Sequence, residues 1–289
     1  MGCGKVFQPH KRARRYDFVE RLWSEYVWGK QTLEQLADAH HLDHKTIQKY
    51  FRERHPETRF PYELIPPHPI FLVIDAYYRS RGDGTIVFRI PELQQNLLWE
   101  NIEYETILAY TRGAQSLVEA GWTIKGITID GRPGTIRALE RYAPVQHCQF
   151  HQLQTVTKYL TKRPKFDSHI ALKRVASTLT KVNEAMFTQL LDAWFVRYGY
   201  LLKERTYHPG GGWSYTHEHL RSCYNSLRRN LPHLFTYLRY PSMPNTTNSL
   251  DGSISHLRTL HRIHRGKSFS SEDNFPGEVL RGKSTKNSL

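Results

Sequence analysis

The sequence predicts a mixed α/β domain that follows a small helical domain, and three observations support this prediction. Apolar runs of strand length occur between residues 70 and 148, separated by turns and by segments with helical spacing. A proline-rich stretch at 55–69 separates these runs from amphipathic helical segments nearer the N-terminus. Residues 152 to about 240 are basic and helical in composition, which indicates several helices after the last strand.

The composition favours a folded, intracellular protein that binds nucleic acid. The chain has 289 residues, of which 39% are hydrophobic, and a formal net charge of +14. Disorder is therefore excluded as a description of the whole chain. No apolar run approaches the roughly 20 residues that span a bilayer, and no secretory signal is recognisable, so we expect a cytoplasmic protein without a membrane partner. A ribosomal or other anionic surface is the alternative partner for such a basic chain.

The charge is distributed unevenly. Residues 152–250 hold 14 basic and 5 acidic side chains, whereas residues 61–151 hold 8 and 10. Carboxylates inside a protein that binds a polyanion repel phosphate unless a cation bridges them. The acidic segment therefore indicates a divalent metal, although for Glu100, Glu103 and Glu105 a solvated surface is the favoured interpretation.

The N-terminal helices have the pattern of a helix-turn-helix over residues 16–54. Thr32 can cap one helix, His41 lies at the turn, and Asp43 can cap the next helix. The outer face of that second helix would present side chains to phosphates and base edges. These candidate DNA-binding residues are His44, Lys45, Gln48, Lys49 and Arg52. The alternative is an ordinary helical hairpin with a basic face.

Beyond the linker at 55–69, the predicted order is strand, strand, strand, helix, strand, helix, strand. The segments are 70–75, 85–90, 97–103, 105–120, 124–130, 135–142 and 145–148. Asp75 and Asp130 each terminate a strongly apolar strand, and neighbouring strands would bring their carboxylates to one edge of the sheet. Two close carboxylates repel each other unless divalent ions lie between them. The alternative is that each aspartate only caps its strand or forms a turn.

Four fragments occur in a characteristic order along the chain. They are Ile74-Asp75, Ile129-Asp130-Gly131, Cys148-Gln149-Phe150-His151 and Pro244-Asn245-Thr246-Thr247-Asn248-Ser249-Leu250-Asp251. Together they resemble a bacterial insertion-sequence transposase of the mutator-like superfamily, with a DDE, RNase H-like catalytic domain. The resemblance extends from the helix-turn-helix through about Gly266. It implies an RNase H-like core at 70–151, an all-helical insertion at 152–243 and a closing helix at 244–266.

The resemblance also implies a catalytic mechanism and its residues. Asp75, Asp130 and Asp251 would be catalytic and would hold Mg²⁺ or Mn²⁺, with two ions acting in DNA strand cleavage and strand transfer. The family usually has glutamate as its third acid, so Asp251 departs from the pattern. The alternative is that Asp251 only lies at a helix start capped by Thr247 or Asn248, where an acidic side chain is favoured by the helix dipole. Cys148, His151 and Asn248 would be supporting residues. A zinc site at Cys148 and His151 would need about four ligands, and we favour a packing role for this pair.

The partners implied are double-stranded DNA, as terminal inverted repeats and as target DNA, and further copies of the chain assembled on DNA. The location implied is the bacterial cytoplasm at the nucleoid. Three alternatives remain: a catalytically impaired remnant, a helix-turn-helix regulator, and a structure-selective nuclease with the same metal site. Residues 1–15 resemble the remainder of a zinc ribbon around Cys3, and residues 267–289 lack helical periodicity and are expected to form an irregular tail.

Overall fold

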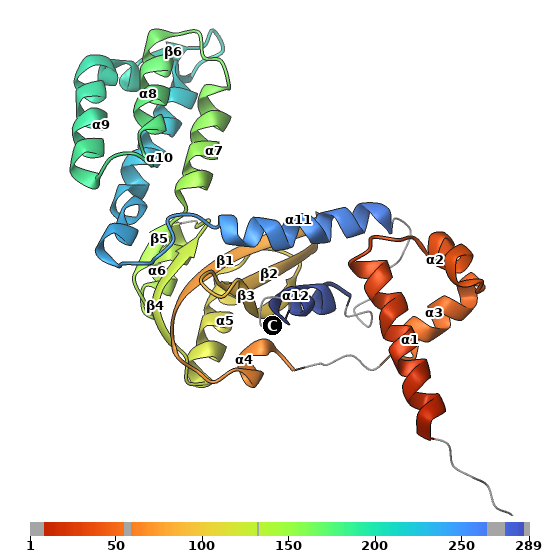
Figure 1. The fold of residues 1–289 in the computed structure, drawn as a ribbon. Coiled ribbons are helices and arrows are strands. Elements are labelled where there is room, and N and C mark those ends of the chain that lie inside the picture. The colour runs from red at the N-terminus through yellow and green to blue at the C-terminus, as the bar shows by residue number, and fades with distance from the viewer. Residues whose placement is uncertain (1–8, 55–58, 132, 265–274, 286–289) are drawn as a thin grey trace, which may run out of the picture. The chain divides into compact units, whose positions relative to one another are not determined.

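The computed structural model describes residues 9–54, 59–131, 133–264 and 275–285 (Figure 1). The chain divides into two compact units. The first unit contains Met1–Arg59 and Ser253–Leu289, and the second contains Phe60–Gly252. Cys3, on which the zinc-ribbon interpretation depends, lies outside the described residues. Among the described helices, none is both long enough and apolar enough to cross a bilayer.

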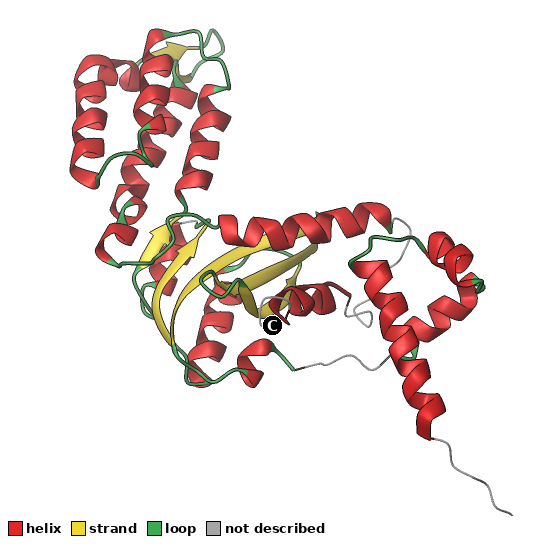
Figure 2. Ribbon diagram, in the orientation of Figure 1, coloured by secondary structure: helices red, strands yellow, loops and turns green. Residues whose placement is uncertain are grey.

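The second unit is built on a five-stranded mixed sheet (Figure 2). Its strands are β1 (Pro69–Ser80), β2 (Asp83–Ile90), β3 (Gln95–Ile102), β4 (Thr123–Ile129) and β5 (Val145–His147). The strand order is β3-β2-β1-β4-β5, with β1, β2 and β3 antiparallel and β1, β4 and β5 parallel. The predicted α/β class is confirmed, and so is the predicted order of strands and helices along the chain from β1 to β5.

The first strand is longer than its sequence pattern predicts. The apolar run predicts a strand that ends at Asp75, whereas β1 continues to Ser80. The parallel partner β4 does end here, because Ile74 of β1 pairs with Ile129, the last residue of β4. The antiparallel partner β2 continues, with Val87 opposite Asp75. Asp75 therefore lies where pairing with β4 stops, inside β1, which continues because it still pairs with β2.

Two helices, α5 (Ile107–Glu119) and α6 (Pro133–Leu139), contribute side chains to the main core of the sheet. Gly113 lets α5 approach closely, since a Cβ at this position would lie 2.0 Å from Cζ of Phe88. Burying the apolar face of the helix against the strands is the main source of stability in this core.

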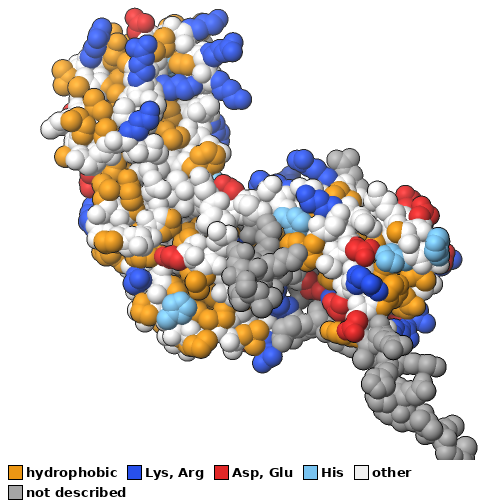
Figure 3. Space-filling model, in the orientation of Figure 1, with side chains coloured by type: hydrophobic (Ala, Val, Ile, Leu, Met, Phe, Trp, Pro, Cys, Tyr) orange, Lys and Arg blue, Asp and Glu red, His pale blue; other side chains and the backbone are white. Residues whose placement is uncertain are grey.

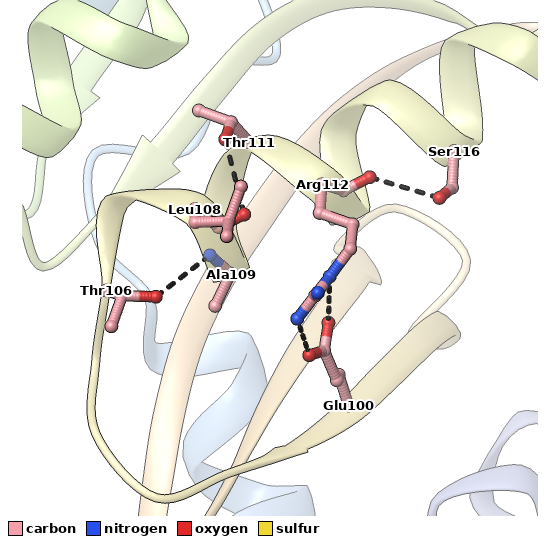
Figure 4. A network of polar contacts seen from close by, with 7 residues as sticks. All are labelled: Glu100, Thr106, Leu108, Ala109, Thr111, Arg112 and Ser116. Atoms are coloured by element: carbon pink, nitrogen blue, oxygen red, sulfur yellow. Dashed lines mark hydrogen bonds and ion pairs between the residues drawn. The ribbon is translucent and has the colours of Figure 1, made fainter.

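Polar contacts fix the start of α5 and tie the helix to β3 (Figure 4). The Thr106 hydroxyl accepts a hydrogen bond from the Ala109 backbone N–H at 3.1 Å, which caps the helix. Arg112 of α5 forms an ion pair with Glu100 of β3. Glu100 therefore belongs to a surface ion pair, in agreement with the interpretation that it solvates a surface.

The segment between β5 and the last part of the second unit forms a helical subdomain with its own core. Its main helices are α7 (Gln149–Leu160), α8 (Asp167–Ser177), α9 (Glu184–Tyr198) and α10 (Glu218–Leu234), with the 3-10 helices η1 (Gly199–Lys203) and η2 (Thr236–Arg239). The composition predicts helices alone, but β6 (Arg205–Tyr207) and β7 (Trp213–Tyr215) form a hairpin as well. Its turn uses positive φ angles at Gly211 and Gly212, which glycine adopts without strain.

Three N-terminal helices belong to the first unit: α1 (Pro9–Val27), α2 (Leu33–His40) and α3 (His44–Arg52). Thr32 and Gln35 form a capping box at α2, and the Asp43 side chain accepts from the Lys45 backbone N–H at the start of α3. His41 has φ 53° and ψ 45°, the left-handed conformation in which glycine is favoured.

The C-terminal tail and the linker at 55–69 each contain a helix that the sequence pattern does not predict. The tail at 267–289 is predicted to be irregular, whereas α12 (Phe275–Thr285) is a helix with Val279 and Leu280 fully buried. Its apolar stretch is too short to give a recognisable period, and packing in the first unit supplies the stability. The predicted linker at 55–69 contains the short helix α4 (Pro61–Leu64). The closing helix α11 spans Asn248–Ile263.

Candidate functional site

The structure brings two of the three predicted acids together. Asp75 lies in β1 at the end of its parallel pairing, and Asp130 directly follows β4. Because Ile74 and Ile129 are paired, the two aspartates occupy equivalent positions on neighbouring parallel strands. Ligands of open α/β sheets bind beyond the carboxyl ends of parallel strands, and this is where the pair lies. Asp75 and Asp130 are called the acid pair below.

The Asp75 carboxylate is partly buried and held by two hydrogen bonds. Its Oδ1 accepts from the Ala76 backbone N–H at 2.8 Å, and its Oδ2 accepts from the Thr247 hydroxyl at 3.1 Å. Burial raises the pKa of Asp75 to about 6, and the charge of Asp130 adds to this, although His151 and the two hydrogen bonds oppose it. The orientation of the carboxylate is therefore fixed while its negative charge is destabilised, a condition that a bound cation would relieve.

A segment that follows the helical subdomain is fastened beside the acid pair. The Thr128 hydroxyl of β4 donates to the Pro244 carbonyl at 2.6 Å. Gln149 and Asn245 exchange two hydrogen bonds, one between side chains at 2.9 Å and one between backbones at 3.0 Å. These contacts hold residues 244 and 245 against β4 and α7, so that Thr247, two residues later, lies within hydrogen-bond distance of Asp75.

Cys148 and His151 belong to the same site and contact each other. The Cys148 thiol is fully buried and accepts a hydrogen bond from the Thr247 backbone N–H at 3.3 Å. His151 Nε2 lies 3.7 Å from Asp130 Oδ2. Burial lowers the pKa of His151, but its contact with Cys148 and the charges of Asp130 and Asp75 outweigh this and raise it to about 9. The imidazolium therefore offsets part of the negative charge of the acid pair.

The third predicted acid is placed differently. Asp251 lies in the first turn of α11 and is exposed to solvent, as is Asn248. Four helical residues advance about 6 Å along the axis, so Asp251 lies about one turn beyond Thr247. Within the described part of the chain, no three Asp, Glu, His or Cys side chains are grouped so that they could hold a metal ion.

The candidate DNA-binding residues lie along the solvent side of α3. Ile47 is fully buried, whereas His44, Lys45, Gln48, Lys49 and Arg52 are all exposed. Lys49 Nζ lies 3.8 Å from a carboxylate oxygen of Glu53, a weak pair between exposed groups that leaves the lysine accessible. Their exposure agrees with the amphipathic pattern, and DNA contact stays a prediction.

Sequence reasoning missed the role of Thr247. The sequence suggests that Thr247 or Asn248 caps α11, whereas the Thr247 hydroxyl donates to Asp75 instead. Its place immediately before a helix, inside the Asn-Thr-Thr-Asn motif, marks the residue, but the partner is visible only in the fold. Comparison of the sequence with known protein families and with curated proteins found no match in either case.

Proposed function

We propose that this protein is a metal-dependent DNA transposase of an insertion sequence, which binds terminal inverted repeats and catalyses strand cleavage and strand transfer. One observation carries the proposal: Asp75 and Asp130 converge at the ends of neighbouring parallel strands, and the Thr247 hydroxyl joins the start of α11 to Asp75. A mixed five-stranded sheet that holds acids at this edge is compatible with an RNase H-like core.

The donor set of the acid pair fits a hard divalent cation. Both residues offer carboxylate oxygens, the ligands that Mg²⁺ and Mn²⁺ prefer, and the buried charge of Asp75 would be stabilised by such a partner. With Asp251 as the third ligand, two bound ions would supply activation of the attacking oxygen and stabilisation of the leaving oxygen. Thr247 would orient Asp75, and His151 would limit the repulsion between the acid pair and the phosphates of DNA.

Recognition of DNA is assigned to α3, because its exposed face carries basic and amide side chains while Ile47 anchors the helix in the unit. The helical subdomain would add affinity that does not depend on base sequence, since residues 152–250 hold 14 basic and only 5 acidic side chains. We also expect several copies of the chain to assemble on the DNA.

The test is cleavage of duplex DNA that carries the inverted repeats flanking the coding sequence. Asp75→Asn and Asp130→Asn should each lower Mg²⁺-dependent cleavage by more than about 100-fold, since changes outside the ligands alone cost about 10- to 100-fold in metal sites. Duplex binding at low salt should remain. Asp167→Asn, which alters an exposed aspartate in α8, is the matched control. Full cleavage by either acid-pair variant would reject the proposal, and cleavage that ignores the repeats would indicate a structure-selective nuclease.

A second candidate is a DNA-binding remnant or regulator that lacks strand transfer. The exposed position of Asp251, with one methylene less than the glutamate usual in the resembled family, favours this candidate. Asp251→Glu separates the two. Cleavage that appears only in this variant would identify an impaired enzyme, whereas equal cleavage by both proteins would show that aspartate is an adequate third ligand.

A further inference from the structure

The hairpin of β6 and β7 exposes large aromatic side chains. Tyr207 and Trp213 face each other across the two strands and are 73% and 43% exposed. A two-stranded hairpin is marginally stable alone, and aromatic side chains contribute most when they are buried. Rings left in solvent on such an element indicate a surface that is covered by a partner.

The hairpin has two chemically different faces. Side chains alternate along a strand, so Arg205, Tyr207, Trp213 and Tyr215 share one face, called the aromatic face below. The opposite face is polar and its side chains bond one another. Thr206 and Thr216 are joined through their hydroxyls at 2.8 Å, and His208 Nε2 lies 3.1 Å from the Ser214 hydroxyl. The polar side chains of one face therefore have hydrogen-bond partners within the hairpin, and the aromatic rings lie on the other face.

Two arginine side chains stack on rings of the aromatic face. Arg205 Cζ lies 3.9 Å from the centroid of the Trp213 ring, and Arg221 Cζ lies 4.0 Å from that of Tyr215. Arg221 is itself fixed by donating to the Leu202 carbonyl at 2.8 Å. A guanidinium held against an aromatic ring keeps hydrogen-bond donors available for phosphate oxygens.

Further positive charge surrounds this end of the helical subdomain. The C-terminal part of α7 lies close to the residues that follow β7, because the rings of Tyr159 and His219 are 6.2 Å apart. Exposed basic side chains lie just after α7, at Lys162, Arg163 and Lys165, and just before β6, at Lys203. Figure 3 shows Lys and Arg side chains gathered over the end of the subdomain that carries β6. The charge is complementary to a polyanion.

We propose that the aromatic face binds single-stranded DNA by stacking on unpaired bases, while the neighbouring cations contact its phosphates. Sequence-tolerant binding of single strands uses this combination of aromatic rings in a basic surface. A base-paired duplex hides the faces of its bases, so the rings would gain nothing from it. The choice of DNA over RNA rests on the proposed function, because both offer the same base faces.

The test measures binding of the full chain to a labelled single strand of about 12 nucleotides, within the roughly 4 to 16 that comparable surfaces cover, and to the matching duplex. Tyr207→Leu and Trp213→Leu should each weaken single-strand binding by about 5- to 150-fold, which corresponds to about 1–3 kcal/mol per stacked base. Duplex binding should be unchanged. Tyr207→Phe and Trp213→Phe should retain most of the affinity, because a phenyl ring still stacks.

A control variant, a fluorescence measurement and an unfolding measurement make the result specific. Tyr104→Leu removes another exposed tyrosine, 61% accessible and located before α5, and should bind the single strand as the parent chain does. Adding the single strand should quench tryptophan fluorescence, and Trp213→Phe should lose that part of the quenching. Thermal unfolding of each variant should match the parent chain, since Tyr207 and Trp213 lie on the hairpin and outside the buried core of the helical subdomain.

Unchanged single-strand affinity in both leucine variants would overturn the proposal, as would an equal loss with single strand and duplex. Tighter binding of RNA of the same sequence would overturn the choice of DNA. The outcome is independent of the acid pair. Trp213-dependent single-strand binding in a protein that does not cleave with Mg²⁺ would support the aromatic face while rejecting the transposase proposal.

Discussion

Arg54 in the first unit and Asp75 in the second are both charged side chains removed from water, but their surroundings differ. Arg54, whose side chain is only 7% exposed, donates to both carboxylate oxygens of Glu20 at 2.9 Å and to Glu278 at 2.7 Å. Its guanidinium also lies 4.2 Å from the Trp23 ring centroid. Asp75 receives two hydrogen bonds but shares its site with the like charge of Asp130.

The directions of the pKa shifts show what this difference means. Burial would lower the pKa of Arg54, but the hydrogen bonds and charges of Glu20 and Glu278 outweigh it and raise the pKa. Burial raises the pKa of Glu278 despite its pairing with Arg54, so the charged form of this carboxylate is less favourable than it would be in water. In Asp75 burial also dominates and favours the neutral form. A compensated charge holds a fold together, whereas an uncompensated one is typical of a functional site.

The largest expected effect is the loss of the compensated charge. Arg54→Leu would leave Glu20 and Glu278 facing each other without their cation, and should lower the free energy of unfolding by about 3 kcal/mol or more. Denaturant unfolding of the full chain measures this. Arg15→Leu is the control, because its 3.2 Å pair with Glu53 is exposed and should contribute about 0–1 kcal/mol. Equal effects of the two substitutions would contradict a structural role for the buried network.

A substitution at Asp75 should have the opposite sign. The pKa of Asp75 in the folded protein, about 6, exceeds its ordinary value of 3.8, so its favourable contribution is present below pH 3.8 and is lost as the pH rises through 6. Asp75→Asn cannot ionise, and should raise the free energy of unfolding at pH 8 by about 1–3 kcal/mol in the absence of divalent metal. Denaturant unfolding at pH 4 and pH 8 measures the gain, which should be smaller at pH 4. A less stable variant at pH 8 would show that the Asp75 charge is compensated after all.

The smallest expected effect concerns the orientation of Asp75. Thr247→Val removes the hydroxyl that donates to Asp75 Oδ2 and should cost about 1 kcal/mol, or about fivefold in cleavage rate. Because this hydrogen bond lowers the pKa of Asp75, the acid limb of the pH–rate profile should move to higher pH. Thr247→Ser should restore both rate and profile. A rate loss that serine does not restore would assign Thr247 to packing alone.

The sheet was predictable because its signals are local. The apolar run from Ile70 to Ile74 and the run that ends at Ile129 both form strands, and both are followed by the expected aspartate. The extension of β1 to Ser80 was not predictable, since it depends on pairing with β2. The helix α12 was missed for a similar reason, because its burial of Leu280 depends on residues distant in sequence.

The candidate site was predictable only in part. The positions of Asp75 and Asp130 follow from the apolar runs that precede them, and the exposed face of α3 follows from helical periodicity. The hydrogen bond from Thr247 to Asp75 joins residues 172 positions apart, and no local pattern encodes it. The parts played by Asp251 and by metal ions remain predictions for the cleavage experiments.

The first unit is discontinuous, and this affects how it is made. Its α1, α2 and α3 leave the ribosome early, but Glu278, which completes the Arg54 network, is translated after the whole second unit. Domains generally fold as units during synthesis. The sheet of the second unit can therefore form before α12, which carries Glu278, has been translated. A nascent chain would therefore carry α3 without the contact between Arg54 and Glu278 until α12 has been translated.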